Sequence, residues 1–221
     1  MTTGFPNSPR LVKAGLVLMD PDTSVVRGVI ALQYNPDSLS RTLQIQAVQG
    51  GQDGVRVDAL RLRGPAVETI KLEAELDATD QLEFPSQNPT AVQFGLQPQL
   101  AQLEMLINPT VETLAADDAM ASQGTLEIIP LEPPLTLFVW SKSRVVPVRI
   151  TDFSVTEEAF DAALNPIRAK VSLGLRVLSI DDLGFSHPGG RVFMSYLGHK
   201  QQLASGAASA AISVLGLAGP P

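Results

Sequence analysis

Cysteine is absent from the 221 residues of the chain, and histidine occurs only twice, as His187 and His199. Without cysteine the chain can form neither a disulfide-linked scaffold nor a metal site built on thiolates. The two histidines do not complete a zinc site by themselves, because such a site would need carboxylates as further ligands. We therefore expect neither a metal ion nor a cofactor.

Positive charge and aromatic side chains are also scarce. The net charge is −7, and lysine and arginine nowhere form the kind of cluster that binds a nucleic-acid backbone. Aromatic residues make up 5% of the chain, and Phe138, Trp140 and Phe153 fall in expected strands. In that setting they favour core packing over a platform for stacking bases or sugars. We therefore expect no nucleic-acid partner.

Long hydrophobic runs are missing as well. The run at 11–19 is interrupted by Lys13 and followed by Asp20-Pro21, so it does not match a signal peptide. The apolar stretch at 207–218 is far shorter than the roughly 20 residues that a membrane-spanning helix needs. We expect a soluble protein that is made in the cytoplasm and has no membrane span.

Recognisable catalytic arrangements are not found. The chain has no Gly-x-Ser-x-Gly motif, and the glycine-rich loop at 49–54 is not followed by the helix start that a phosphate loop requires. Adjacent carboxylates on a strand point to opposite faces, so they do not converge on one substrate. Only a glycosidase pair from distant parts of the chain stays open. The carboxylate pairs are Asp77/Asp80, Asp117/Asp118, Glu157/Glu158 and Asp181/Asp182.

The clearest pattern that is present is a strict alternation at 167–177. Such a period of two predicts a strand with one face buried and the other in water. The apolar row is Ile167, Ala169, Val171, Leu173, Leu175 and Val177, and the polar row is Arg168, Lys170, Ser172, Gly174 and Arg176.

Two further strands are expected just before this one. The run at 135–140 predicts one of them. The run at 146–155 predicts the other, and its apolar phase slips by one residue near Asp152, which indicates a β-bulge. Asn165-Pro166 is typical of a turn, so we expect the last two strands to pair antiparallel across a loop of about ten residues at 157–166.

The N-terminal half predicts four strands, at 11–19, 26–34, 39–47 and 67–76. Asp20-Pro21 separates the first two, and Asn35-Pro36 separates the second and third, which we expect to form a hairpin. Arg41 is the one charged residue on the apolar side of the third strand. The fourth strand has an inward row of Ile70, Leu72, Ala74 and Leu76 and an outward row of Thr69, Lys71, Glu73 and Glu75.

Helical spacing is clearest in Leu96, Leu100, Leu103 and Ile107, with a first-turn proline at 98 and Asn-Pro at 108–109 as the stop. Residues 110–124 are expected to be a mobile, partly helical connection, and 191–203 an amphipathic helix. The predicted fold is mainly β, an antiparallel tube-like barrel or sandwich with one packed helix. We divide the chain into a flexible arm at 1–10, a β domain at 11–182, and an extended, partly helical tail at 183–221 that serves interactions.

Three stretches resemble the tube-domain family of contractile injection systems, the phage-tail-like particles of bacteria. They are QYNPDSLS at 33–40, LRLRGPAVETIKLEAELD at 60–77 and PPLTLFVWSKSRVVPVRITDFSVTEEAFDAALNPIRAKVSLGLRVLS at 133–179. The stretches occur in the family's order, and the resemblance covers roughly residues 13–180. Two departures stand out: Ser-Lys follows Trp140 where glycine is usual, and nothing after residue 182 resembles the LysM module that members commonly carry.

The resemblance implies a structural protein of the baseplate and not an enzyme. Members of the family form hexameric rings that join the inner tube to the spike or hub and initiate tube assembly in the cytoplasm. The implied partners are further copies of the chain, inner-tube proteins, the spike or hub and baseplate wedge proteins. The outward rows at 69–75 and 168–176 are then candidates for lumen or inter-ring contacts, unless they are simply solvated. Alternative interpretations are the main inner-tube subunit, a particle-associated cell-wall hydrolase and a stand-alone ligand-binding β-barrel.

Overall fold

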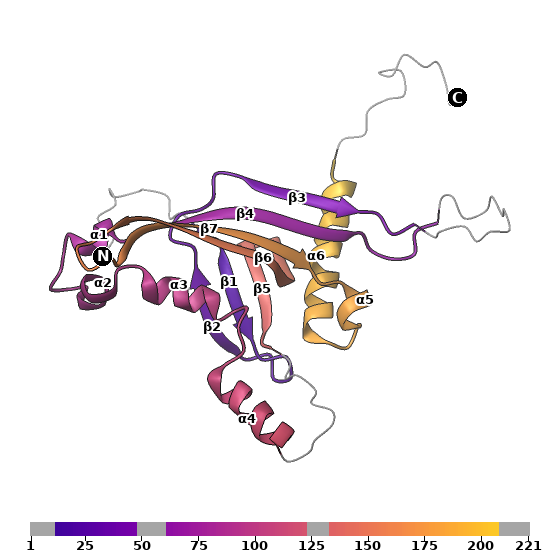
Figure 1. Ribbon diagram of the computed structural model, residues 1–221. Coiled ribbons are helices and arrows are strands. Elements are labelled where there is room, and N and C mark those ends of the chain that lie inside the picture. The colour runs from indigo at the N-terminus through magenta and orange to yellow at the C-terminus, as the bar shows by residue number, and fades with distance from the viewer. Residues whose placement is uncertain (1–11, 48–60, 123–132, 208–221) are drawn as a thin grey trace.

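Seven strands form one antiparallel sheet in the order β2-β1-β5-β6-β7-β4-β3 (Figure 1). The computed structural model describes residues 12–47, 61–122 and 133–207. The expected arm at 1–10, the glycine-rich loop at 49–54 and the end of the tail from 208 lie outside these residues. The strands are β1 (Gly15–Met19), β2 (Val26–Ala31), β3 (Leu39–Gln44), β4 (Val67–Asp77), β5 (Leu135–Ser141), β6 (Arg144–Phe160) and β7 (Pro166–Val177).

Strand β6 lies at the corner of the sheet. Its first part pairs with β5 as far as Val148, and from Val148 onward it pairs with β7. The register shifts between Ile150 and Asp152, which confirms the predicted slip near Asp152. A bulge adds a residue to one strand and bends it, so β6 can belong to both parts of the sheet.

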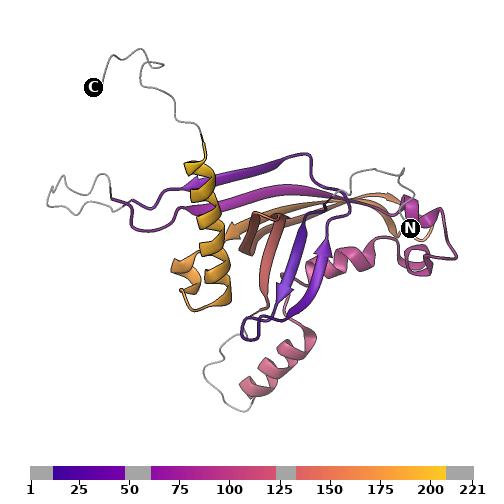
Figure 2. The ribbon, with the colours of Figure 1, turned by 180° about the vertical axis from the view of Figure 1, so that it is seen from behind.

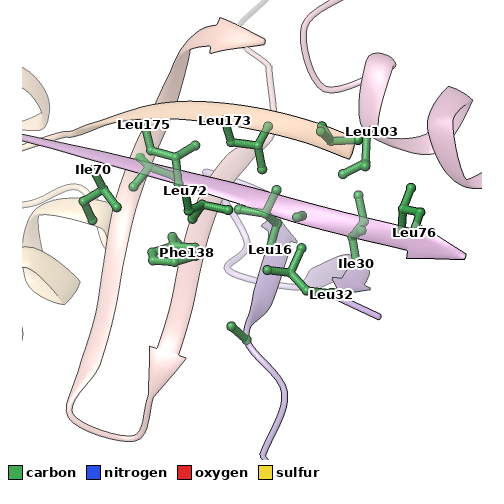
Figure 3. Packing of buried hydrophobic residues seen from close by; sticks show 14 of the residues in the cluster. Leu16, Ile30, Leu32, Ile70, Leu72, Leu76, Leu103, Phe138, Leu173 and Leu175 are labelled. Atoms are coloured by element: carbon green, nitrogen blue, oxygen red, sulfur yellow. The ribbon is translucent and has the colours of Figure 1, made fainter. Parts of the chain in front are cut away.

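The bend produces two layers with one core between them. β1, β2 and β5 run across the long strands β3, β4 and β7, as Figures 1 and 2 both show. Leu16 and Phe138 from one layer meet Leu72 and Leu175 from the other in a single buried cluster (Figure 3). The predicted mainly β, antiparallel fold is therefore confirmed, although the core receives side chains from two helices where one packed helix was predicted.

The alternating rows place the core as expected. Ile70, Leu72, Ala74 and Leu76 of β4 are all buried, and their outward neighbours lie at the surface. In β7 the row from Ala169 to Val177 is buried in the same way. A period of two was sufficient here because each strand has one face on the core and one in water.

Six helices accompany the strands within the described residues, and α3 and α6 place side chains in the core cluster. The predicted helix is α3, with Pro98 in its first turn and Leu100 and Leu103 buried; it ends before Ile107. The predicted helix at 191–203 lies inside α6, whose Phe193 and Tyr196 are buried. The bounds are α1 (Thr79–Leu82), α2 (Pro89–Phe94), α3 (Gln97–Glu104), α4 (Val111–Ser122), α5 (Ile180–Leu183) and α6 (Pro188–Ser205).

Helix α4 fills most of the connection expected at 110–124. It has no buried residue and stands away from the sheet in both ribbon views (Figures 1 and 2). The helical part of the expectation is thus confirmed by a complete 12-residue helix. Its stability comes from its own backbone and side chains, because it has no packed face.

The predicted hairpin of the second and third strands is wrong. β2 and β3 lie at opposite edges of the sheet, and residues 32–38 connect the two layers instead. The Asn35 side chain accepts a hydrogen bond from Ala14 N and donates one to Val12 O, both at 2.9 Å. Gln33 hydrogen-bonds both the N–H and the C=O of Asp77. Gln33 and Asn35 therefore tie the two layers together, and Asn35-Pro36 does not form a hairpin turn.

The loop expected at 157–166 is also shorter than predicted. β6 continues to Phe160 and β7 begins at Pro166, so only residues 161–165 connect them. The Asp161 carboxylate accepts hydrogen bonds from the N–H groups of Ala163 and Asn165, each at 2.8 Å, and closes a compact turn. The acidic pair Glu157 and Glu158 is part of the strand, and each pairs with a residue of β7.

Candidate functional site

The outward rows predicted on β4 and β7 lie side by side on one face. The register places Thr69 opposite Arg176, Glu73 opposite Ser172, and Glu75 opposite Lys170. β3 and the second part of β6 extend this face on either side with Ser40, Thr42 and Gln44, and with Asp152, Ser154, Thr156 and Glu158. We call the outward surface of β3, β4, β7 and β6 the polar face.

Charge on the polar face is balanced, with five basic and five acidic side chains. Arg168 contacts Asp77 at 3.1 Å, and Lys170 contacts Glu158 at 3.5 Å. These exposed pairs contribute little to stability, about 0–1 kcal/mol each. The basic side chains are Lys71, Arg149, Arg168, Lys170 and Arg176, and the acidic ones are Glu73, Glu75, Asp77, Asp152 and Glu158.

An open depression of about 770 Å³ lies in the middle of the polar face. Gly174 forms part of its floor, and a side chain at this position would collide with the Asp152 carboxylate. Glu73 and Asp152 both line the depression, from strands that have β7 between them. The four strands thus present a broad, shallow surface of mixed charge.

The polar face ends in two open strand edges. In the part of the chain that the structure describes, β3 pairs only with β4, and β6 beyond Val148 pairs only with β7. Open edges expose unpaired N–H and C=O groups, and soluble proteins usually protect them with charged side chains, proline, bulges or a covering segment. β3 has neither a proline nor a bulge, and its one charged residue, Arg41, is paired with the buried Glu68. Within the described residues no second strand pairs with β3, which makes this edge a candidate for strand addition.

Apolar side chains lie beside both edges, on the side that faces the core. Leu43 of β3 is 49% exposed, although its row continues the core. On β6, Phe153 and Val155 are only partly buried. A strand added at either edge would cover these side chains and complete a row that the chain leaves unfinished.

The two edges are staggered along the strands. β3 lies beside the first half of β4, level with the C-terminal half of β7, whereas the open part of β6 pairs with β7 along its whole length, from Arg176 to Pro166. The midpoints of the two edges are therefore offset by about four residues, and this offset over four strand spacings corresponds to a strand tilt of about 35°. Closed β-barrels have tilts of about 35–45°.

A buried carboxylate lies behind the polar face, in phase with the apolar row of β4. Glu68 is 3% exposed and accepts hydrogen bonds from Arg41 Nε at 2.6 Å and Lys200 Nζ at 2.9 Å. The Tyr196 hydroxyl contacts both carboxylate oxygens, at 3.1 and 3.2 Å, and accepts from Arg41 Nη2 at 2.9 Å. Lys200 also lies over the Tyr196 ring. These four residues, the Glu68 cluster, tie α6 to β3 and β4.

Burial would by itself raise the pKa of Glu68, but the hydrogen bonds from Arg41 and Lys200 outweigh it and leave the pKa lowered. The hydrogen bond between Arg41 and Glu68 raises the pKa of Arg41. The cluster therefore stays ionised at neutral pH, with one carboxylate shared between two cations. Its chemistry is suited to holding elements together, because it is not open to a substrate.

We predict an acid sensitivity from this cluster. Because the folded pKa of Glu68 lies below its unfolded value of about 4.3, its contribution is fully present above that pH and is lost as the pH falls through the folded pKa. Urea unfolding should show similar stability at pH 7 and pH 5 and a loss at pH 3, and that loss should be smaller in Glu68→Gln. Equal slopes for the two proteins would contradict the assignment.

Several of the remaining acidic and histidine candidates have structural contacts. Asp182 accepts from Ser179 N at the start of α5 and from Arg176 Nη2, while the Asp77 carboxylate lies beside Arg168. His187 caps α6 through Gly189 N. Among the described residues, no three His, Cys, Asp or Glu side chains lie close enough together to hold a metal ion.

Sequence reasoning missed the Glu68 cluster, although two signals were present. Arg41 interrupts the apolar row of β3, and Glu68 stands in phase with Ile70 and Leu72 in β4. Two opposite charges on the buried sides of two strands would have predicted a pair once those strands were known to be neighbours. Tyr196 and Lys200 could not be found this way, because α6 is distant in sequence.

No protein-family model matches the chain, and no curated protein matches it significantly. No helix in the described part of the chain is long and apolar enough to cross a membrane.

Proposed function

We propose that this chain is a structural subunit of a contractile injection particle and assembles into a ring between the inner tube and the baseplate. The pair of open edges on the polar face is the observation that carries the proposal. The likeness of residues 13–180 to the tube-domain family supports it independently. The subunit would catalyse no reaction and would act through assembly.

The strand order supports ring closure by strand pairing between copies. β3 of one copy would pair with the open part of β6 in the next copy, at a heterologous contact that can close into a ring. The four strands alternate in direction. A copy related by rotation about the ring axis therefore brings its β6 next to β3 in antiparallel orientation. The same contact between β3 and β6, which we call the seam, would repeat around the ring.

Six copies would contribute about 24 strands to a barrel with a backbone diameter of about 50 Å. The polar faces would line the channel, and the β1, β2 and β5 layer would lie outside. Such a ring would template the tube ring stacked on it and contact the spike or hub and the baseplate wedge proteins. Its assembly would take place in the cytoplasm.

The seam gives a direct test. Thr42 and Thr156 lie on the polar face at the two edges, and the chain has no native cysteine. Thr42→Cys combined with Thr156→Cys should give a ladder of disulfide-linked multimers on a non-reducing gel. Val29→Cys on the β2 edge, combined with Thr156→Cys, is the matched control and should stay monomeric. A monomeric full-length protein without cross-links would refute the ring.

Copy number separates the adaptor from the main inner-tube subunit, which would use the same seam. Quantitative mass spectrometry of sheath-containing particles should find about one ring of this chain per particle. Copies in proportion to the sheath would instead assign the chain to the tube. A hydrolase would need Glu73 and Asp152 for activity, so cell-wall cleavage lost on Glu73→Gln would favour the enzyme.

A further inference from the structure

Helix α6 crosses the long strands near one end of the sheet and extends beyond β3 in both ribbon views (Figures 1 and 2). It packs against β6, and Tyr196 and Lys200 bind Glu68 on β4. Arg41 on β3 reaches the Tyr196 hydroxyl. The Glu68 cluster therefore fixes the helix where it passes under the edge of its own sheet.

The sheet-facing side of α6 continues past this edge. Leu203 is seven residues after Tyr196, so the two side chains point in nearly the same direction. Tyr196 is 4% exposed, whereas Leu203 is 71% exposed. Residues 201–205, which we call the α6 overhang, are all exposed. An apolar side chain thus faces the plane of the sheet at a point where residues 12–47, 61–122 and 133–207 provide no strand to cover it.

The length of the overhang fits one missing strand. Seven helical residues advance by about 10 Å, which is about two strand spacings of 4.8 Å. Tyr196 lies at β4, so Leu203 lies about one spacing beyond β3. This is the place that a strand added to β3 would take, and Leu43 of β3 is half exposed beside it.

We propose that the α6 overhang crosses the seam and packs Leu203 on the core-facing side of β6 in the neighbouring copy. The partner is a second copy of this chain, so the inference rests on the proposed ring. The stagger described above brings the middle of the neighbour's open β6 edge beside β3. Because core-facing side chains recur at every second residue of a strand, either Phe153 or Val155 of the neighbour then lies beside Leu43. Both side chains are only partly buried within their own chain. The overhang would complete the neighbour's core while its own chain anchors it through Glu68.

Cross-linking of the full-length protein tests the contact. Leu203→Cys combined with Val155→Cys should give disulfide-linked multimers under the conditions that assemble the ring. A link within one chain is excluded. Leu203 lies beyond β3, and β3 is itself about three strand spacings, or about 14 Å, from Val155 on β6, whereas a disulfide needs Cα atoms within about 7 Å. Val111→Cys, on the unpacked helix α4, combined with Val155→Cys is the matched control and should give no ladder.

The seam and the overhang can fail separately. A ladder from Thr42→Cys with Thr156→Cys, but none from Leu203→Cys with Val155→Cys, would overturn the overhang contact and leave the ring intact. Ladders from neither pair would overturn both.

A second variant measures what the contact contributes. Leu203→Asp should raise the protein concentration needed for half-assembly about 10-fold or more, because a buried leucine is replaced by a charge at every seam. The urea unfolding midpoint of the monomer should not change. Leu164→Asp, equally exposed at the β6–β7 turn, is the control for added charge. Equal assembly by both variants would contradict the proposal.

Discussion

Replacing Glu68 by glutamine is expected to lower the free energy of unfolding by about 3 kcal/mol, because removing one partner from a buried ionic network leaves the others uncompensated. Arg41 and Lys200 would then approach a neutral amide in a site where Glu68 is only 3% exposed. The Tyr196 hydroxyl would lose its charged partner at the same time. Loosening of α6 should accompany the loss of stability.

Urea unfolding at pH 7 measures this effect, and hydrogen exchange along α6 localises it. Glu73→Gln is the matched control, since Glu73 has the same charge on the same strand but lies on the exposed polar face. Its unfolding free energy should change by no more than about 0.5 kcal/mol. Equal effects of the two variants would show that the Glu68 cluster does not stabilise the fold.

Gly190→Ala is expected to destabilise the protein by about 2–3 kcal/mol, because a methyl group at this position would overlap the carbonyl oxygen of Gly184. Gly184 ends α5, and Gly190 lies in the first turn of α6. The overlap involves two backbone segments, so no side-chain rotation relieves it. α6 would have to move away from α5, which also displaces Tyr196 from Glu68.

Gly198→Ala in the same helix is expected to have the opposite effect on the free energy of unfolding. Apart from its own helix backbone and its chain neighbours, no atom lies within 4 Å of the position that its β-carbon would take. Alanine loses less conformational entropy than glycine in a helix, so this variant should gain about 0.5–1 kcal/mol. Thermal or urea unfolding of both variants checks the pair, and a destabilised Gly198→Ala together with an unaffected Gly190→Ala would refute this account of α6 docking.

The strands of this fold were predictable where the signal is local. The alternating rows of β4 and β7 and the phase slip near Asp152 were confirmed, because each depends on which side chains face one core. Strand order was not predictable in the same way. Asn35-Pro36 has the composition of a tight turn, yet the Asn35 side chain hydrogen-bonds the residues just before β1. That contact joins residues more than 20 positions apart, so the local sequence does not reveal it.

The candidate surfaces were predicted in part. The outward rows of β4 and β7 were named from the sequence, but their balance of charge depends on the register with β3 and β6. The open edges follow from which strands lack neighbours, and a single-sequence period contains no such information. The overhang of α6 likewise depends on where the helix is anchored, which required Tyr196 and Glu68 to be seen together.

Strand β6 has a mechanical consequence through its place in both layers. Its 17 residues pass from the layer of β1, β2 and β5 into the layer of β3, β4 and β7 without a break in the backbone. A load that slides one layer over the other must therefore extend a covalent chain as well as separate packed surfaces. In the ring that we propose, each subunit would resist shear between its layers through such a tether.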